Sequence, residues 1–174
     1  DVEAIVISET HVKADDDYEL VSLTVTGGTD TQPAASVQVR LSDEDLAAEL
    51  GYDSVWTINH FQSNLATPQP ISMTASLIPR SGNMTIGTGI LLLPMFHPVH
   101  IAEEFATLDH LSGGRVVLGV GAGYRDNEFA AFGIDPDTRF RRLDESLRVI
   151  RALWSGEPVT HDGEYFPQTD ASIG

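Results

Sequence analysis

The sequence predicts an α/β protein: a partial (β/α)8, TIM-barrel-like domain that follows a divergent N-terminal β segment. Apolar runs typical of buried strands alternate with amphipathic runs typical of helices across residues 46–155, which is the signature of a parallel sheet or barrel. The two clearest strand runs, 84–92 and 115–120, both carry glycines toward their ends. Because β/α barrels bind ligands at the carboxyl ends of their strands, these glycines mark the expected ligand-binding edge.

Residues 1–41 follow a different pattern. Apolar and polar side chains alternate over 21–26 and again over 37–41, with a Gly-Gly pair as a turn between them. A period of two predicts half-exposed strands, whereas barrel strands covered on both faces are continuously apolar. We therefore expect two parts in the chain, a divergent β segment over 1–41 and the partial barrel over 42–174.

The first half of the barrel part has clear boundaries. Ser42 caps a helix that Gly51 can end, because a hydroxyl satisfies free N–H groups and glycine tolerates the left-handed conformation of a helix end. A short strand is expected over 53–58. A second helix over 71–78 stops at Pro79, whose ring blocks a further helical turn.

The second half continues the alternation of helices and strands. The helix expected over 98–111 has one apolar and one acidic face, and a Gly-Gly pair turns the chain into the strand over 115–120. An Asp-Gly pair within 160–165 predicts a tight hairpin. The helix expected over 139–155 carries four apolar residues at helical spacing that we expect to be buried: Leu143, Leu147, Ile150 and Trp154.

Acidic residues far outnumber basic ones. The 174 residues include 26 Asp and Glu against 10 Lys and Arg, a formal net charge of −16. Such a surface repels phosphate backbones, so nucleic acid is not an expected partner. An ordinary acidic enzyme and a halophilic one both fit this composition, because salt screens the repulsion between carboxylates. A melting temperature that rises up to molar KCl would favour the halophilic interpretation.

Cysteine is absent, which excludes disulfides, thiolate metal sites and a cysteine nucleophile. No apolar run approaches the roughly 20 residues that span a bilayer, and no basic region before an apolar one opens the sequence. We therefore expect a cytoplasmic protein that does not enter a membrane.

A glycine-rich loop follows the strand over 115–120. Gly121, Ala122 and Gly123 expose backbone N–H groups, which suit a phosphate. The dinucleotide-binding pattern requires a glycine where Tyr124 stands, and no P-loop lysine is present, so both of those phosphate motifs are excluded. Glycines that simply permit a tight turn are the alternative.

Two further features are candidates for ligand contacts. Gly87 and Gly89 lie inside an expected strand, where glycine marks either close approach by a ligand or the packing of small residues. His60 follows the strand over 53–58, and an imidazole can hydrogen-bond a ring carbonyl or move a proton near neutral pH. A surface histidine without a function is the alternative.

Two groups of charged residues favour structural roles. His97, His100 and Glu104 share one helix face, but no further histidine follows at helical spacing, so we expect no metal site. A second group can either clamp a phosphate or pair with Asp144, Glu145 and neighbouring acids, and we favour the pairing. These are the arginines of the last helix, Arg139, Arg141 and Arg142.

Three stretches, 60–62, 87–98 and 111–121, carry a resemblance to a known family. Over about residues 46–166 the sequence resembles the luciferase-like flavin monooxygenases, whose members bind FMN or the deazaflavin F420. The resemblance implies a flavin-dependent oxidoreductase that binds FMN and acts on a small organic substrate, and an F420-dependent oxidoreductase is the alternative. In such enzymes the cofactor carries the redox chemistry, while the protein positions it and excludes water.

The resemblance also implies roles for particular residues. A cis peptide bond between Gly89 and Ile90 backs the cofactor ring, and His60 is the catalytic residue beside the reacting ring. In a sugar-phosphate dehydrogenase of this group, a catalytic glutamate occupies the position of Tyr124, so the resemblance argues against that activity. The implied cofactor-binding residues are Gly89, Ile90, Gly121, Ala122 and Gly123.

A non-catalytic structural or interaction fragment is the competing hypothesis. The barrels of this family need eight strands, and only three convincing ones lie between residues 53 and 120. An incomplete parallel sheet leaves an edge and an apolar face that must be covered. Either a second copy or the N-terminal strands can cover them. We expect a homodimer, because the half-exposed strands of 1–41 would fill a barrel interior poorly.

Overall fold

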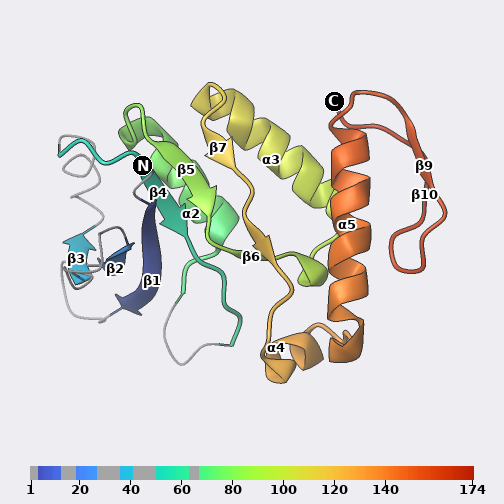
Figure 1. Cartoon of the computed structure of the whole chain (residues 1–174), viewed down its shortest axis with the longest axis horizontal. Coiled ribbons are helices and arrows are strands. Elements are labelled where there is room, and N and C mark those ends of the chain that lie inside the picture. The colour runs from blue at the N-terminus through green and yellow to red at the C-terminus, as the bar shows by residue number, and fades with distance from the viewer. Residues whose placement is uncertain (1–3, 13–18, 27–35, 41–49, 63–66) are drawn as a thin grey trace. The chain divides into compact units, whose positions relative to one another are not determined.

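The computed structural model describes residues 4–12, 19–26, 36–40, 50–62 and 67–174 (Figure 1). Its strands are β1 (Ala4–Val12), β2 (Glu19–Thr26), β3 (Ser36–Arg40), β4 (Ser54–Thr57), β5 (Thr85–Thr88), β6 (Leu91–Leu92), β7 (Val116–Val117), β8 (Val120–Gly121), β9 (Val159–His161) and β10 (Gln168–Ala171). Its α-helices are α2 (Pro70–Leu77), α3 (Pro98–Ser112), α4 (Asp126–Ala131) and α5 (Arg139–Leu153). Short 3-10 helices are η2 (Ile78–Arg80), η3 (Leu93–Met95) and η4 (Pro136–Thr138).

Most of the expected elements are present. The expected strand over 53–58 and helices over 71–78 and 98–111 correspond to β4, α2 and α3. The helix expected over 42–51 falls largely outside the described residues, although Gly51 has the positive φ of 77° expected where a helix ends. Within the described ranges, no helix combines the length and the hydropathy needed to cross a membrane.

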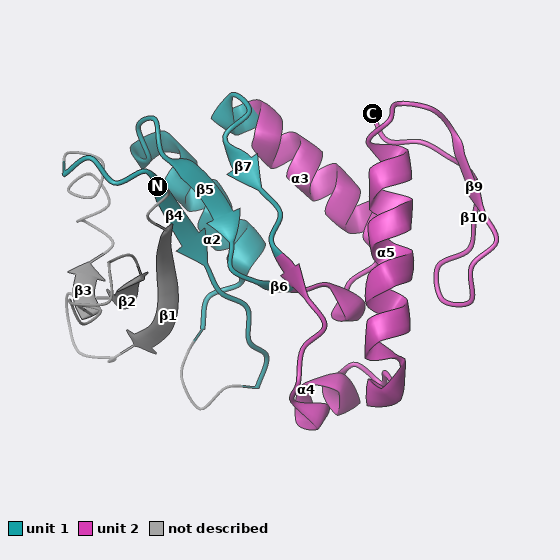
Figure 2. Cartoon of the chain, viewed as in Figure 1, with its two compact units in different colours: residues 1–91, 111–119 teal, residues 92–110, 120–174 magenta. Residues whose placement is uncertain are grey.

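The chain forms two compact units (Figure 2). The first contains residues 1–91 and 111–119, and the second contains 92–110 and 120–174.

The first unit is built on a six-stranded sheet with the order β3-β2-β1-β4-β5-β7. β1, β2 and β3 pair antiparallel, whereas β4 pairs parallel with both β1 and β5, and β5 pairs parallel with β7. The alternation of side chains correctly predicted β2 and β3, but it missed β1. Since Val6 of β1 pairs with Trp56 of β4, the N-terminal strands cover one edge of the incomplete parallel sheet.

Each of two expected strands divides into two short ones at its glycines. The run over 84–92 becomes β5 and β6, and the run over 115–120 becomes β7 and β8. β5 pairs with β7 in the large sheet, whereas β6 and β8 pair in a separate two-stranded sheet. The Thr88 hydroxyl explains the break, because it accepts the Gly119 N–H (3.1 Å) and donates to the Gly119 carbonyl (2.8 Å) in place of a regular backbone ladder.

A helix covers one face of the parallel strands, and β7 is the last strand at one side of the sheet. α2 packs against β4 and β5, where the hydroxyls of Thr57 and Thr74 lie 3.1 Å apart (Figure 1). The apolar run of β7 was expected to be buried, but Val117 is 41% exposed. β7 is the last strand of the sheet, and no strand among the described residues pairs with its outer edge.

The second unit contains α5, whose buried face differs from the expected one. Ile150 is buried as expected, but Leu143 and Leu147 are half-buried and Trp154 is 45% exposed. The buried stripe is displaced along the helix because it includes the carboxylate of Glu145, which turns inward to bind backbone N–H groups. Its members are Glu145, Ser146, Val149, Ile150 and Leu153.

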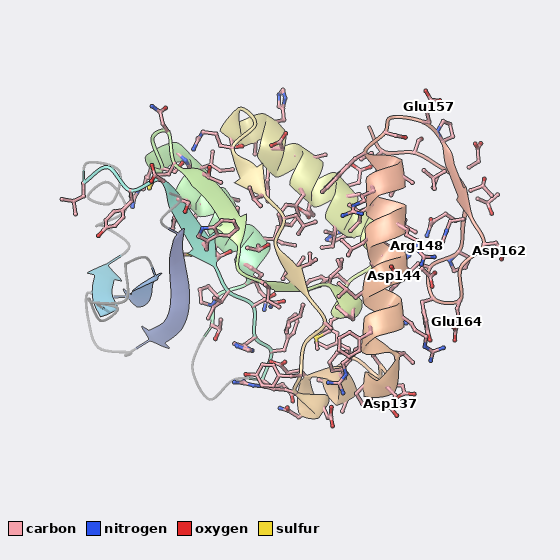
Figure 3. The ribbon with its side chains drawn as sticks, viewed as in Figure 1. Asp137, Asp144, Arg148, Glu157, Asp162 and Glu164 are labelled. Carbon is pink, nitrogen blue, oxygen red and sulfur yellow. The ribbon has the colours of Figure 1, made fainter. Side chains whose placement is uncertain are left out.

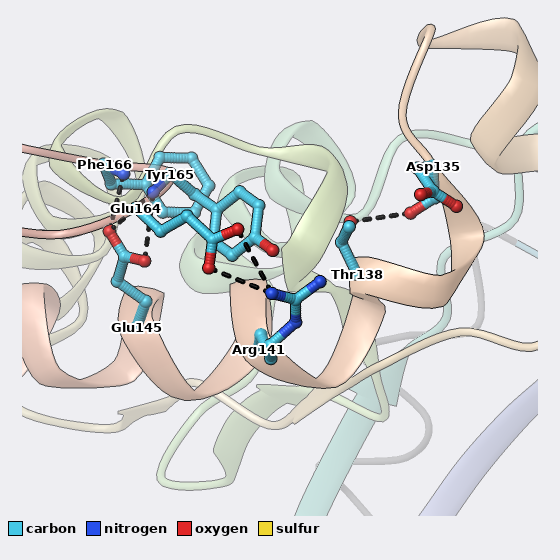
Figure 4. Close-up of polar contacts among 7 residues, drawn as sticks. All are labelled: Asp135, Thr138, Arg141, Glu145, Glu164, Tyr165 and Phe166. Atoms are coloured by element: carbon cyan, nitrogen blue, oxygen red, sulfur yellow. Dashed lines mark hydrogen bonds and ion pairs between the residues drawn. The ribbon is translucent and has the colours of Figure 1, made fainter.

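The inward carboxylate also shapes the C-terminal hairpin. β9 and β10 are antiparallel, but residues 162–167 connect them, so the expected tight turn is wrong. Glu145 accepts the N–H of Tyr165 (3.1 Å to each oxygen) and that of Phe166 (2.6 Å), as Figure 4 shows. The loop therefore folds around a carboxylate of α5 instead of closing in two residues.

The acidic composition is visible on the surface of this unit. Figure 3 labels five exposed acids on η4, on α5, after α5 and in the hairpin loop: Asp137, Asp144, Glu157, Asp162 and Glu164. Two of these acids have arginine partners on α5. Asp144 pairs with Arg148, and Glu164 pairs with Arg141 at 3.0 Å.

Replacing Gly163 with alanine should destabilise the chain. A Cβ at this position would lie 2.6 Å from Cδ of Glu145 and 2.5 Å from Nε2 of His161, so the buried carboxylate has to move. Moving it weakens the hydrogen bonds to Tyr165 and Phe166, and charged hydrogen bonds of this kind contribute about 2 kcal/mol each. We expect Gly163→Ala to lower the melting temperature by about 4–8 °C, measured by circular dichroism.

The exposed neighbour Asp162 provides the control for this prediction. Asp162→Ala changes the same loop without touching Glu145, so its melting temperature should equal that of the wild type. Equal melting temperatures for Gly163→Ala and Asp162→Ala would contradict the role given to the carboxylate.

Candidate functional site

The backbone at the carboxyl end of β5 leaves the regular sheet. The peptide bond between Gly89 and Ile90 is cis, which confirms the bond expected there. Hydrogen bonds hold this segment on both sides: the Gly89 N–H donates to the carbonyl of Thr57 (2.6 Å), and the Leu91 N–H donates to that of Gly119 (2.8 Å). Ile90 is 38% exposed, so a firmly held segment presents an apolar side chain at the strand end.

His60 lies at the same end of the sheet. Thr57, the last residue of β4, pairs with Thr88, the last residue of β5, and the two strands are parallel. The residues that follow them, His60 on one strand and Gly89 on the other, therefore share the carboxyl edge, where β/α barrels bind their ligands. His60 is half-buried and follows the buried Asn59.

A residue that sequence analysis missed borders this segment. The side chain of Trp56 lies against Gly87 and Gly89, and its indole N–H donates to the Ser54 hydroxyl at 2.9 Å. The sequence did contain a signal for this contact: Trp56 lies in one expected strand, and Gly87 and Gly89 alternate in the next.

The glycine-rich loop lies in the second unit. Gly121 ends β8, and Gly121, Ala122 and Gly123 are all half-exposed. Gly123 has a φ of 78°, and a Cβ there would lie 3.2 Å from Phe129. Backbone conformation and packing therefore both require this glycine, as the tight-turn interpretation expects. Half-exposed backbone in such a turn is also accessible to an anion.

Side chains after this loop pair with one another. Tyr124 is 69% exposed, and the Arg125 guanidinium lies 5.4 Å from its ring. Arg139 reaches back from α5 to Asp126 at 2.8 Å.

Of the other two arginines singled out in the sequence, Arg141 forms an ion pair as expected but with a different acid, whereas Arg142 lies over aromatic rings. Arg141 binds Glu164, and Arg142 lies 4.9 Å from the ring of Tyr165 and 5.0 Å from that of Phe166. Their partners come from the hairpin loop, because Glu145 is already engaged by the N–H groups of that loop.

The histidines at the start of α3 have structural roles. His97 Nδ1 accepts the N–H of Val99 at 3.3 Å, which caps the helix, and the His97 ring packs edge-on against Phe166 at 5.6 Å. His100 pairs with Glu104 at 3.5 Å. Among the residues that the structure describes, no three metal-ligating side chains form a group.

Comparison with known proteins identifies the family to which the chain belongs. Residues 20–173 match the family of luciferase-like monooxygenases. The chain belongs to the luciferase-like monooxygenase family. The match extends beyond residues 46–166, over which the resemblance was visible in the sequence.

Individual relatives of this luciferase-like chain use different cofactors. The chain is 40% identical over 136 residues to an F420-dependent glucose-6-phosphate dehydrogenase of Amycolatopsis mediterranei, covering 73% of this chain and 40% of that protein. The chain therefore spans well under half the length of this relative.

Solved structures show the same fold. An F420-dependent secondary alcohol dehydrogenase in complex with an F420-acetone adduct has a TM-score of 0.68 and 32% identity, over 76% of this chain and 43% of that one. The oxygenating constituent of 3,6-diketocamphane monooxygenase from Pseudomonas putida, in complex with FMN, has a TM-score of 0.67 and 27% identity, over 77% and 37%. The luciferase-like chain is a partial (β/α)8 fold.

The chain should become less stable as the pH is lowered, and part of this loss should come from His97. Burial, and then the charge of His100, lowers the pKa of His97 below its ordinary value of 6.5. As the pH falls through 6.5, the unfolded chain takes up a proton that the folded chain resists, so this contribution to stability is present above that pH and lost below it. His97→Asn keeps a capping acceptor but does not titrate. We expect it to reduce the loss of melting temperature between pH 7.5 and pH 5.5.

His110 serves as the control because it is exposed in the last turn of α3. His110→Asn makes the same substitution at an exposed position of the same helix, so it should lose as much melting temperature at low pH as the wild type. A loss in His97→Asn as large as that of the wild type would show that the lowered pKa of His97 does not cause the pH dependence.

Proposed function

We propose that this luciferase-like chain binds a flavin or deazaflavin and acts as an oxidoreductase on a small organic substrate. The observation that carries the proposal is the carboxyl edge of β4 and β5, where His60 and the Gly89–Ile90 segment follow paired strand ends. A half-exposed apolar side chain and a backbone fixed from both sides fit the face of a planar ring. When bound, the cofactor supplies the redox chemistry.

The first candidate for the cofactor is F420, and the second is FMN. FMN was the first expectation from the sequence, whereas the 40% identity to an F420-dependent dehydrogenase and the likeness to an F420-bound structure favour the deazaflavin. The likeness to an FMN-bound monooxygenase keeps FMN as the alternative. Tyr124, which stands where a sugar-phosphate dehydrogenase has its catalytic glutamate, argues for another substrate.

Each part of the proposed site has one task. The segment from Gly89 to Ile90 supports one face of the ring and excludes water from it. The His60 imidazole hydrogen-bonds the ring edge and holds or moves a proton there. For the cofactor phosphate, the prediction from the sequence stays the backbone N–H groups of the loop over 121–123.

Replacing His60 tests the proposal. His60→Ala should weaken the binding of F420 or FMN, because one hydrogen bond to the ring is lost, by about tenfold. Its melting temperature should change little, since a half-buried side chain after a strand contributes little to packing. The affinities of the wild type and of His60→Ala are measured by titrating each purified chain with cofactor and recording the cofactor fluorescence.

His110→Ala is the matched control, because it removes an exposed imidazole from α3. It should bind cofactor like the wild type. Equal affinities for wild type, His60→Ala and His110→Ala would remove His60 from the site. No binding of either cofactor by the wild type would instead favour the non-catalytic fragment, a possibility raised by the 40% coverage of the dehydrogenase.

Self-association remains part of the proposal. β1 pairs with β4, so one edge of the parallel strands is covered within the chain, whereas β7 is the last strand of the sheet. A homodimer would remove exposed apolar surface such as that of Val117 from water. Light scattering on the purified chain distinguishes the dimer from a monomer.

A further inference from the structure

The indole of Trp56 lies on the face of the sheet opposite α2. Thr57 points to α2, where its hydroxyl meets that of Thr74, and successive side chains of a strand point to opposite faces. Trp56 therefore shares the other face with Ser54, whose hydroxyl accepts the indole N–H at 2.9 Å. The side chain is thus held at its polar end by its own strand.

Three glycines border the rest of the indole: Gly87 in β5, Gly89 directly after β5, and Gly119 between β7 and β8. A Cβ on Gly87 would lie 2.5 Å from Cε3 of Trp56 and closer still to Cζ3, so the ring occupies the space of that missing side chain. A Cβ on Gly119 would lie 3.8 Å from Cζ3. A Cβ on Gly89 would lie 3.4 Å from the Trp56 Cβ and 3.7 Å from Cε3.

This arrangement makes the indole the support for the backbone at the end of β5. Gly87 and Gly89 have no side chains, so on this face the Trp56 ring packs directly against their backbone. Removing the indole would leave space into which the Gly89 backbone can relax. The position of Gly89, and with it that of Ile90, therefore depends on the size and orientation of residue 56.

We propose that Trp56 is a positioning residue for the cofactor ring, because its indole fixes the Gly89–Ile90 backbone against which the ring binds. The inference rests on the proposed function. A ring site needs its supporting backbone within about half an ångström of the productive geometry. Trp56 should therefore affect the binding of the ring as well as the packing of the sheet.

Graded substitutions of Trp56 test the inference. Trp56→Phe keeps a planar ring against Gly87 and should weaken F420 or FMN binding slightly. Trp56→Leu removes the plane and should weaken binding by about tenfold or more. Binding is measured by titration at a temperature at which circular dichroism shows every variant folded. The visible circular dichroism of the bound cofactor reports ring geometry and should change in Trp56→Leu.

Val55→Ala is the control for a purely structural role. Val55 is adjacent in β4, is 6% exposed and points to the opposite face, so the substitution removes core packing without touching the glycines. It should lower the melting temperature while leaving the affinity and the cofactor spectrum of the folded chain unchanged.

Each outcome has a distinct meaning. Weaker binding and a changed spectrum in Trp56→Leu, with neither change in Val55→Ala, support the inference. Equal affinity and spectra in wild type and Trp56→Leu overturn it and leave the proposed function intact. Equal losses in Trp56→Leu and Val55→Ala also overturn it, because packing then explains both. Failure of the wild type to bind F420 or FMN overturns the proposed function and the inference together.

Discussion

The approach of Gly119 to Thr88 is the constraint on which the strand-end region depends. A Cβ at position 119 would lie 3.3 Å from the carbonyl carbon of Thr88 and closer still to its oxygen, so only glycine fits. At this separation the Thr88 hydroxyl bonds both the N–H and the carbonyl of Gly119. The regular pairing of β5 with β7 therefore ends just before these residues, and the segment over 89–90 lies outside the large sheet. Hydrogen bonds from Gly89 and Leu91 still hold this segment in place.

A single carboxylate organises the second unit in a comparable way. Burying a charge in a chain of net charge −16 is costly unless donors surround it, and Glu145 receives the N–H groups of Tyr165 and Phe166. Gly163 leaves the space that the carboxylate occupies. The buried stripe of α5, the length of the hairpin connection and the partners of Arg141 and Arg142 all follow from this placement.

Local patterns predicted the elements well and the tertiary details less well. Proline and glycine punctuation placed α2 and α3 closely, because these residues act through their own backbone conformation. The break in β5 at Gly89 was foreseeable from its glycines and from the family resemblance. The buried stripe of α5 was misplaced because periodicity treats a glutamate as polar, whereas backbone donors far along the chain draw Glu145 inside. Trp56 was missed because the glycines against which its ring packs lie far along the chain.

The charge of the chain restricts how an anionic cofactor can be held. The arginines near the loop over 121–123 already have partners: Arg125 lies over Tyr124, and Arg139 binds Asp126. If a phosphate binds at this loop, the backbone N–H groups of the loop would hold it, and such groups need no free cation. If this loop holds the phosphate, the net charge of −16 opposes binding. Added salt would screen that repulsion and strengthen binding, whereas it would weaken binding at a site that depends on arginine.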